Sequence, residues 1–471
     1  MPAFQILATG VRPSAATMGD CPLGQIPAEF THKSQLQLHI NVSATVSDVS
    51  DTVSDVSATV SRHRITLTCN FHTDGPPHLR GPQRLHDGEI FYRFNVSSYQ
   101  TRLPNHQAIL NAGADACFVA LFPIASALEY TAIQVSPTGI SCGLARQVPE
   151  ITGVYELQLR GRRDSRLARM TAVGPVRDVV PPHKHRSRNG AGVSLTGGVD
   201  SWFSVVTHKQ ELSSLVYALN FDVQQDDKVL WRSVSRLLTS AAASLKLPLT
   251  FVDTNLRRHA ETGWQAAAHK WGGAPADYGW GRLSHGHCLA SVYHALSATT
   301  VSRAYIPSTH TYGFNAPWGS DALHDHLWSS DELTIVHDGS YMSRLAKTYA
   351  ITSSNAHKET VLSSLRVCWR NPKRMLNCGR CEKCVRTMVG LEVAGTRTQC
   401  STFDPVSSAE LTDRINALPR IRSSSHGSSN SDAAMWQEFI NHNGDARFGQ
   451  RLPKEMIKAI QQMMHAGPSS K

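Results

Sequence analysis

The chain has 471 residues, a formal net charge of +10 and a pI near 9.2. This length is enough for two or three domains with a substantial buried core, and the positive charge favours anionic ligands such as nucleotides. Because Lys and Arg are spread along the chain without a long basic run, we do not expect a nucleic-acid partner.

Targeting signals and cysteine usage both favour a soluble cytoplasmic protein. No signal sequence opens the chain, and no run of about eighteen apolar residues predicts a membrane span. Outside one cluster described below, the cysteines are scattered singly, as is typical of a reducing compartment. We therefore expect no disulfides among these single cysteines, which are Cys21, Cys69, Cys117, Cys142, Cys288 and Cys400.

Residues 1–180 predict an accessory α+β domain that ends near Pro181-Pro182. Residues 43–61 are a low-complexity run of Ser, Thr, Asp and Val with valines every three or four positions. These residue types are weak helix formers, so a loop or the edge of a strand is at least as well favoured as a helix. Other segments predict two antiparallel strands (64–71 and 89–96), a buried apolar segment that can be a helix (117–125) and a further strand (130–135).

Residues 193–201, Val-Ser-Leu-Thr-Gly-Gly-Val-Asp-Ser, predict a strand that leads through a glycine turn into a helix. Two glycines let backbone N–H groups approach an oxyanion, and the following helix N-terminus adds its positive dipole end. The mononucleotide loop needs Gly-Lys-Ser/Thr, and the dinucleotide fingerprint needs a third glycine, so neither fits. A phosphate or pyrophosphate site is predicted; the alternative is an ordinary tight turn in which Asp200 only caps the helix.

These residues resemble the PP-loop, Ser-Gly-Gly-x-Asp-Ser, of the ATP pyrophosphatase superfamily, with Thr196 in place of the first serine. The resemblance implies an α/β fold with a parallel sheet, ATP as cofactor, and release of AMP and pyrophosphate. It also implies that Asp200 helps to place Mg²⁺ and that Ser201 acts at the catalytic centre. The residues that would bind ATP from this loop are Ser194, Thr196, Gly197, Gly198, Val199, Asp200 and Ser201.

Strands and helices alternate after the loop, which predicts a parallel sheet with crossover helices. The expected strands are 191–195, 215–221, 249–252, 303–307 and 332–336, and the expected helices include 202–211, 230–245 and 288–298. Ligands of such sheets bind at the carboxyl ends of the strands. Asp222, Asp253 and the run Ser308-Thr309-His310 follow strands there, so they are candidates for the nucleotide and acceptor pockets, although each could equally cap a loop.

Histidines and cations between the loop and the cysteine cluster are further candidates. His285 lies in Ser-His-Gly-His before a helix and could be a general base, although a serine cap with a solvent-facing histidine is slightly favoured. His324 and its neighbours lack a third metal ligand in sequence, so a metal site is not favoured there. By position, Arg344 or Lys347 could neutralise phosphate charge, and we assign Lys347 to the catalytic set; a solvated helix face explains both equally well.

Cys368, Cys378, Cys381 and Cys384 form a cluster with two CxxC steps. Four thiolates at this spacing suit a tetrahedral Zn²⁺ site, and four protein ligands leave no open position for catalysis. A redox CxxC is the rival, but the extra cysteines on the same short segment favour metal. We therefore expect a structural zinc.

The loop and the cysteine cluster together resemble 7-cyano-7-deazaguanine synthase and its QueC-like relatives, over roughly residues 190–393. The resemblance implies an ATP-dependent, AMP-forming C–N ligase that adenylates a carboxylate or amide before ammonia or an amine displaces AMP. Its acceptor would be a deazapurine acid, a small natural-product acid or a protein terminus. We expect a PP-loop domain at residues 190–400, a linker at 423–432 and a helical tail at 433–471 that covers the core or forms a homodimer.

Two other functions stay open from the sequence. A PP-loop sulfurtransferase would adenylate a nucleic-acid carbonyl and use a catalytic cysteine to deliver sulfur. A nucleotide-sensing module would bind ATP without turnover and use the zinc knuckle and the N-terminal sheet to dock a partner.

Overall fold

The computed structural model describes residues 37–52, 59–74, 85, 87–97, 104–159, 172–177, 190–271, 279–314, 317–353, 356–372, 375–421 and 431–464. Most of the linker expected at residues 423–432, and the boundary expected at Pro181-Pro182, lie outside them. The described strands are β1 (Gln37–Thr52), β2 (Thr59–Asp74), β3 (Gly88–Ser97), β4 (Ala132–Ser136), β5 (Ala172–Gly174), β6 (Gly190–Ser194), β7 (Leu212–Ala218), β8 (Leu249–Thr254), β9 (Val301–Pro307) and β10 (Thr334–Asp338).

The described α-helices fall into an N-terminal pair, a set that alternates with the strands, and a C-terminal group. They are α1 (His106–Ala127), α2 (Cys142–Leu159), α3 (Val199–His208), α4 (Lys228–Ser244), α5 (Leu256–Lys270), α6 (His285–Leu296), α7 (Arg344–Thr352), α8 (Lys358–Ser364), α9 (Glu382–Val393), α10 (Ser408–Asn416), α11 (Ser431–Asn441) and α12 (Lys454–Met464).

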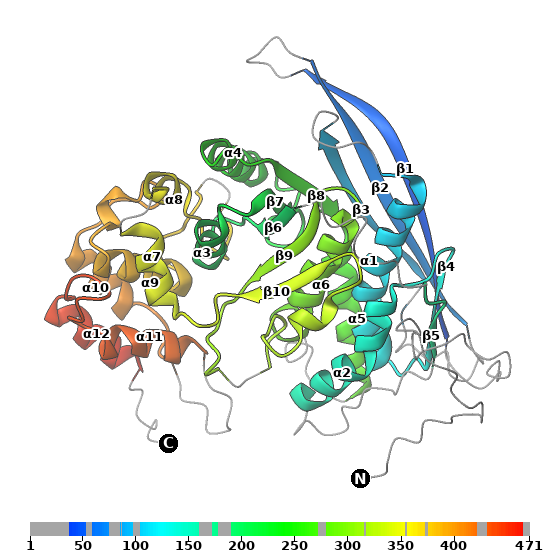
Figure 1. Ribbon diagram of the computed structural model, residues 1–471. Coiled ribbons are helices and arrows are strands. Elements are labelled where there is room, and N and C mark those ends of the chain that lie inside the picture. The colour runs from blue at the N-terminus through cyan, green and yellow to red at the C-terminus, as the bar shows by residue number, and fades with distance from the viewer. Residues whose placement is uncertain are drawn as a thin grey trace, which may run out of the picture.

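A ten-stranded sheet runs through the molecule in the order β10-β9-β6-β7-β8-β3-β2-β1-β4-β5 (Figure 1). Only the neighbours β8-β3, β3-β2 and β2-β1 pair antiparallel among its described strands; the others are parallel. The α/β class and the mostly parallel sheet are thus confirmed. The sheet continues from the parallel strands after residue 190 into the expected accessory domain through β8 and β3, where Tyr92 and Arg93 pair with Thr254 and Asp253.

Strand periodicity explains the antiparallel part. In β2 the side chains of Ile65, Leu67, Cys69 and Phe71 are buried, whereas their neighbours are at least partly exposed. Where the structure describes it, the low-complexity run belongs to β1 and β2 and forms strand. The Val and Thr residues of this run have high β-propensity, and pairing of β1 with β2 along their full described lengths supplies the backbone partners.

Helices cover both faces of the parallel strands. In β7, Leu215 and Tyr217 pack into the core beneath α3 and α4, whereas Val216 and Ala218 point into the opposite core with α1, α5 and α6. Helices α7 to α12 gather at the side of the molecule remote from β1 and β2 (Figure 1). Because both faces of the parallel strands are buried, successive residues in these strands are nearly all apolar.

Helix α1 is buried on all sides, with seventeen of its residues in the interior. By length and composition it could cross a membrane, with a mean hydropathy of 1.7 over its most apolar stretch, but 89% of that stretch is buried inside the protein. The buried apolar segment expected at residues 117–125 is confirmed as part of this helix, which begins earlier than the sequence indicated. In this fold it is a core helix packed against the sheet.

Cys69 and Cys117 form a disulfide between β2 and α1, and both are fully buried. The expectation that these cysteines stay unpaired is therefore wrong. They are 48 residues apart in sequence, so only the packing of α1 on the sheet brings their sulfur atoms together. The cytoplasmic location stays a prediction.

Candidate functional site

The order of the parallel strands marks a topological switch point at the end of β6. From β6 the chain adds β7 and β8 on one side, then crosses to add β9 and β10 on the other. Ligands of open α/β sheets bind at such a switch point, outside the carboxyl ends of the two strands that flank it. The loop from Leu195 to Gly198 follows β6, and Ser308 follows β9, so both lie at this switch point.

The glycine loop closes tightly on itself and on a distant segment. Gly197 has φ +84°, and a Cβ there would lie 3.2 Å from the carbonyl oxygen of Ser364. Its own carbonyl accepts a hydrogen bond from the Arg366 backbone N–H at 2.8 Å. Ser201 Oγ accepts from the Thr196 N–H at 3.2 Å and donates to the Gly198 carbonyl at 3.1 Å. Residue 197 must therefore be glycine for the loop to keep this shape.

The N-terminus of α3 points its first backbone N–H groups toward this loop. Gly198 is the N-cap residue, and no side chain caps the helix there. Helix N-terminal N–H groups without a cap are donors for an anion, and the helix dipole favours negative charge at that end. The N-terminus of α3 is therefore a candidate anion site.

Asp200, Arg344 and Lys347 meet beside the loop. Arg344 Nη2 binds Asp200 Oδ2, and Lys347 Nζ lies 3.8 Å from Asp200 Oδ1, which has no hydrogen bond although it is buried. Lys347 is 1% exposed and donates to the carbonyl and the hydroxyl of Ser308 at 2.8 and 2.9 Å. Burial lowers the pKa of Lys347, and the negative charge of Asp200 opposes this shift. Two cations thus lie beside the carboxylate of Asp200 at the switch point, and Ser308 holds one of them, Lys347.

The other residues expected to bind nucleotide do not all converge on this point. Ser194 is buried at the end of β6 and its hydroxyl lies 2.8 Å from that of Tyr293, while Val199 packs into the core. Asp222 is exposed. Asp253 accepts from Arg93 and from Asn220, both at 3.1 Å, so its carboxylate joins β8 to β3 and to the loop after β7.

The candidate histidines occupy different environments. Burial lowers the pKa of His310 to about 3, and its Nε2 has no hydrogen-bond partner. Burial also lowers the pKa of His285, to about 4, and its Nδ1 lies 3.3 Å from the Trp280 carbonyl. His324 Nδ1 lies 3.2 Å from the fully buried Asp325, whose other oxygen lies 2.7 Å from His337 Nδ1. The first two are therefore neutral at pH 7, and His324 belongs to a buried ion-pair cluster.

Cys368, Cys378, Cys381 and Cys384 come together at the start of α9, with their sulfur atoms all within 4.8 Å of one another. The Cys368–Cys381 and Cys378–Cys384 sulfur pairs are 4.0 and 3.9 Å apart. A tetrahedral Zn²⁺ with Zn–S bonds of about 2.3 Å needs sulfur pairs roughly 3.8 Å apart, so the four thiolates fit one zinc ion. The expected cluster is confirmed as a potential metal site.

Asn377 stabilises the cysteine cluster through four hydrogen bonds. Its side-chain oxygen accepts from the backbone N–H groups of Val367 and Cys368, and its Nδ2 donates to the carbonyls of Leu365 and Thr402. Leu365 and Arg366 belong to the segment that contacts the glycine loop. The cysteine cluster and Asn377 therefore fix the segment at Leu365 and Arg366, which contacts the glycine loop.

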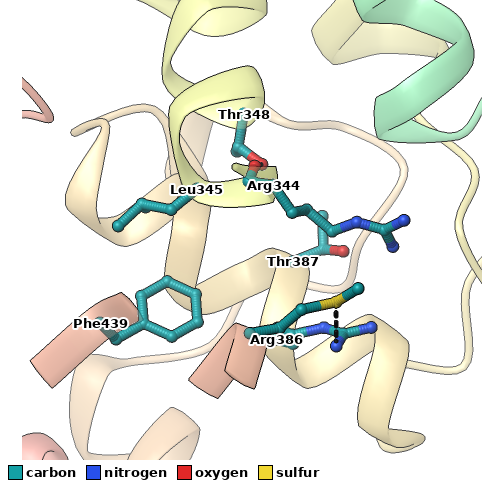
Figure 2. A pocket seen from close by; sticks show the side chains of 7 residues that line it. Arg344, Leu345, Thr348, Arg386, Thr387 and Phe439 are labelled. Atoms are coloured by element: carbon teal, nitrogen blue, oxygen red, sulfur yellow. Dashed lines mark hydrogen bonds between the residues drawn. The ribbon is translucent and has the colours of Figure 1, made fainter. Parts of the chain in front are cut away.

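A small pocket lies next to Arg344, between α7, α9 and α11 (Figure 2). Its cavity volume is about 10 Å³, enough for about one water molecule. Figure 2 shows the guanidinium groups of Arg344 and Arg386 on one side and the Phe439 ring on the other. The lining residues are Arg344, Leu345, Thr348, Arg386, Thr387, Met435 and Phe439.

Sequence reasoning missed three residues of this region. Arg366 supports the glycine loop through its backbone, and Arg386 lines the pocket two positions after the last knuckle cysteine. Asp338 ends β10 and accepts from Ser204 of α3 at 2.5 Å. The available signals were position at a strand end for Asp338 and proximity to the CxxC motif for Arg386.

Comparisons of the chain with protein-family models, with curated proteins and with solved structures gave no match.

Proposed function

We propose that the protein is an ATP-dependent ligase or synthase of the QueC-like type, with a PP-loop at residues 194–201. It would activate a carboxylate or amide as an adenylate, with release of pyrophosphate, before ammonia or an amine displaces AMP. The acceptor classes are a deazapurine acid, a small natural-product acid or a protein terminus. ATP bound with Mg²⁺ would supply the AMP group that makes the acyl oxygen a leaving group.

The observation that carries the proposal is the meeting of Asp200, Arg344 and Lys347 at the switch point, directly after an uncapped glycine turn. Cations that are buried beside free backbone donors suit a polyphosphate. A carboxylate that neutralises them in the absence of ligand is well placed to bind Mg²⁺ once phosphate oxygens take over the cations. An ordinary structural turn would not require this charge arrangement.

Each residue then has a defined task. The backbone N–H groups at the uncapped start of α3 bind phosphate oxygens, and Ser201 keeps the shape of the loop through its hydrogen bonds to Thr196 and Gly198. Lys347, fixed by Ser308, and Arg344 contribute positive charge where pyrophosphate departs. The zinc knuckle is structural, because four cysteine ligands leave no open coordination position.

The sulfurtransferase alternative is less well supported by the described cysteines. Outside the knuckle, the free cysteines are Cys288 and Cys400 in the described part of the chain, and both are buried. Burial raises the pKa of each thiol, which disfavours the nucleophilic thiolate. The nucleotide-sensing alternative differs from the ligase in one respect: the sensing module would bind ATP without turning it over.

The test is pyrophosphate and AMP release from Mg²⁺-ATP by zinc-loaded protein, with deazapurine acids, amino acids, small organic acids and peptides as acceptors. Asp200→Asn keeps the shape of the side chain but removes its charge, so we expect at least a hundredfold lower turnover. Asp226→Asn, an exposed change after β7, is the matched control and should keep wild-type turnover.

Three results would contradict the ligase proposal. Release of ADP and phosphate would indicate another bond cleavage. Tight ATP binding without turnover on any acceptor would favour the sensing module. Undiminished turnover in Asp200→Asn would show that the site lies elsewhere.

A further inference from the structure

The pocket between α7, α9 and α11 shares a side chain with the proposed nucleotide site. Arg344 lines the pocket (Figure 2). It also binds Asp200 beside the glycine loop. A group that enters the pocket therefore lies one arginine side chain away from the carboxylate proposed to hold Mg²⁺. This arrangement suits the second substrate of an ATP-dependent reaction.

Arg386 is incompletely satisfied in this pocket. Its side chain is 7% exposed, and its Nη1 donates to Met435 Sδ at 2.7 Å (Figure 2). Its Nε lies 3.2 Å from a Glu382 oxygen but makes no hydrogen bond, and Nη1 also donates to Asp432 at 3.3 Å. A thioether is a weak acceptor, whereas a carboxylate accepts strongly and in the planar geometry of a guanidinium.

Arg344 is incompletely satisfied as well. Its Nε is buried without a hydrogen bond, and Asp200 supplies the partner of its Nη2. In the proposed ATP complex, phosphate oxygens would replace Asp200 at Arg344, and Glu438 is a further carboxylate whose charge acts on Arg344. Arg386 keeps Glu382 and Asp432 beside it. The Nε atoms of Arg344 and Arg386 are buried without a hydrogen bond, so each side chain still offers a donor to a group in the pocket.

The remaining walls of the pocket are largely apolar. Leu345 and Phe439 lie on the side opposite the two guanidinium groups, and Met435 lies against Arg386. Its present volume of about 10 Å³ admits little more than one water, so a ligand must displace the Met435 side chain. An unbranched methionine moves readily between rotamers, and it would surrender only a weak hydrogen bond.

From these contacts we propose that this pocket binds the carboxylate of the acceptor, and that the acceptor is a small organic acid with a compact apolar or aromatic group. The inference rests on the proposed adenylating function. Arg344 and Arg386 bind the carboxylate, while Phe439 and Leu345 contact the apolar part of the acid. Met435 and Phe439 belong to α11, which lies outside residues 190–393, the part that resembles QueC-like proteins. The C-terminal segment of this chain would therefore select the acceptor.

The test titrates phenylacetate and hexanoate, with their uncharged amides as controls, into full-length zinc-loaded protein. Mg²⁺ and α,β-methylene-ATP are present at saturation, because this analogue cannot be cleaved at the bond that adenylation breaks. We expect at least one acid to bind at least tenfold more tightly than its amide.

Variants locate the binding site. Arg386→Met should weaken the acid at least tenfold, and Phe439→Ala should weaken acid and amide alike. Arg236→Met, an exposed change on α4, is the matched control and should bind as wild type. If Arg386→Met fails to fold, as judged by zinc content and thermal unfolding, Met435→Trp fills the pocket and should abolish acid binding.

The outcomes separate the two proposals. Binding of the ATP analogue without binding of either acid, or acid binding unaffected by Arg386→Met and Met435→Trp, would overturn the pocket proposal and leave the nucleotide site intact. Acid binding that depends on Arg386, in a protein that does not bind the analogue, would support the carboxylate site and refute the adenylating function.

Discussion

Replacement of one knuckle cysteine gives a sharp test of the zinc site. In Cys381→Ala, one of four sulfur ligands is lost from a cluster that spans at most 4.8 Å. A structural zinc contributes an apparent free energy of about 10–16 kcal/mol, so loss of one ligand in four removes roughly 2.5–4 kcal/mol. At about 2–4 °C per kcal/mol for a large domain, we expect the unfolding temperature to fall by roughly 5–15 °C.

The assay is zinc content per chain by elemental analysis, together with thermal unfolding before and after treatment with a chelator. Wild type should carry one zinc, and Cys381→Ala should carry markedly less. Cys400→Ala is the matched control, because Cys400 is a buried cysteine of the same core that lies outside the cluster. Full zinc content in Cys381→Ala, or equal losses of zinc in the two variants, would refute the assignment.

Three further perturbations test the glycine loop, its cation and the buried histidines. Lys347→Met leaves the acceptors on Ser308 without their donor, so we expect a loss of about 2–4 kcal/mol in unfolding free energy by calorimetry and at least tenfold weaker ATP binding. Gly197→Ala forces a side chain onto φ +84° and should cost roughly 1–3 kcal/mol, more than Gly198→Ala, where φ is −73°; equal losses in denaturant titrations would contradict the loop geometry. Burial lowers the pKa of His287 to about 3, so the unfolded chain binds this proton first as the pH falls below about 6.5, and roughly 2–3 kcal/mol of stability should be lost by pH 4.5. His287→Gln should flatten this part of the stability curve, and an unchanged curve would show that other groups cause the loss.

The chemical motifs and the main secondary structure were readable from the sequence, because both depend on neighbours along the chain. The turn at Gly197-Gly198 follows from residues that permit unusual backbone geometry beside an apolar strand, and the CxxC spacing by itself brings thiolates within reach of one metal. The alternation of β2 and the parallel strands of the second half likewise follow from local periodicity.

Tertiary structure decided which of these elements meet. Asp200 and Arg344 are 144 residues apart, and only the strand order and the packing of α7 against α3 join them at the switch point. The same is true of the disulfide between Cys69 and Cys117, and of the pocket that α11 closes against Arg386. Local residue patterns specify the conformation of each segment, whereas contacts between distant segments depend on how all buried faces pack at once, and no single stretch of sequence carries that information.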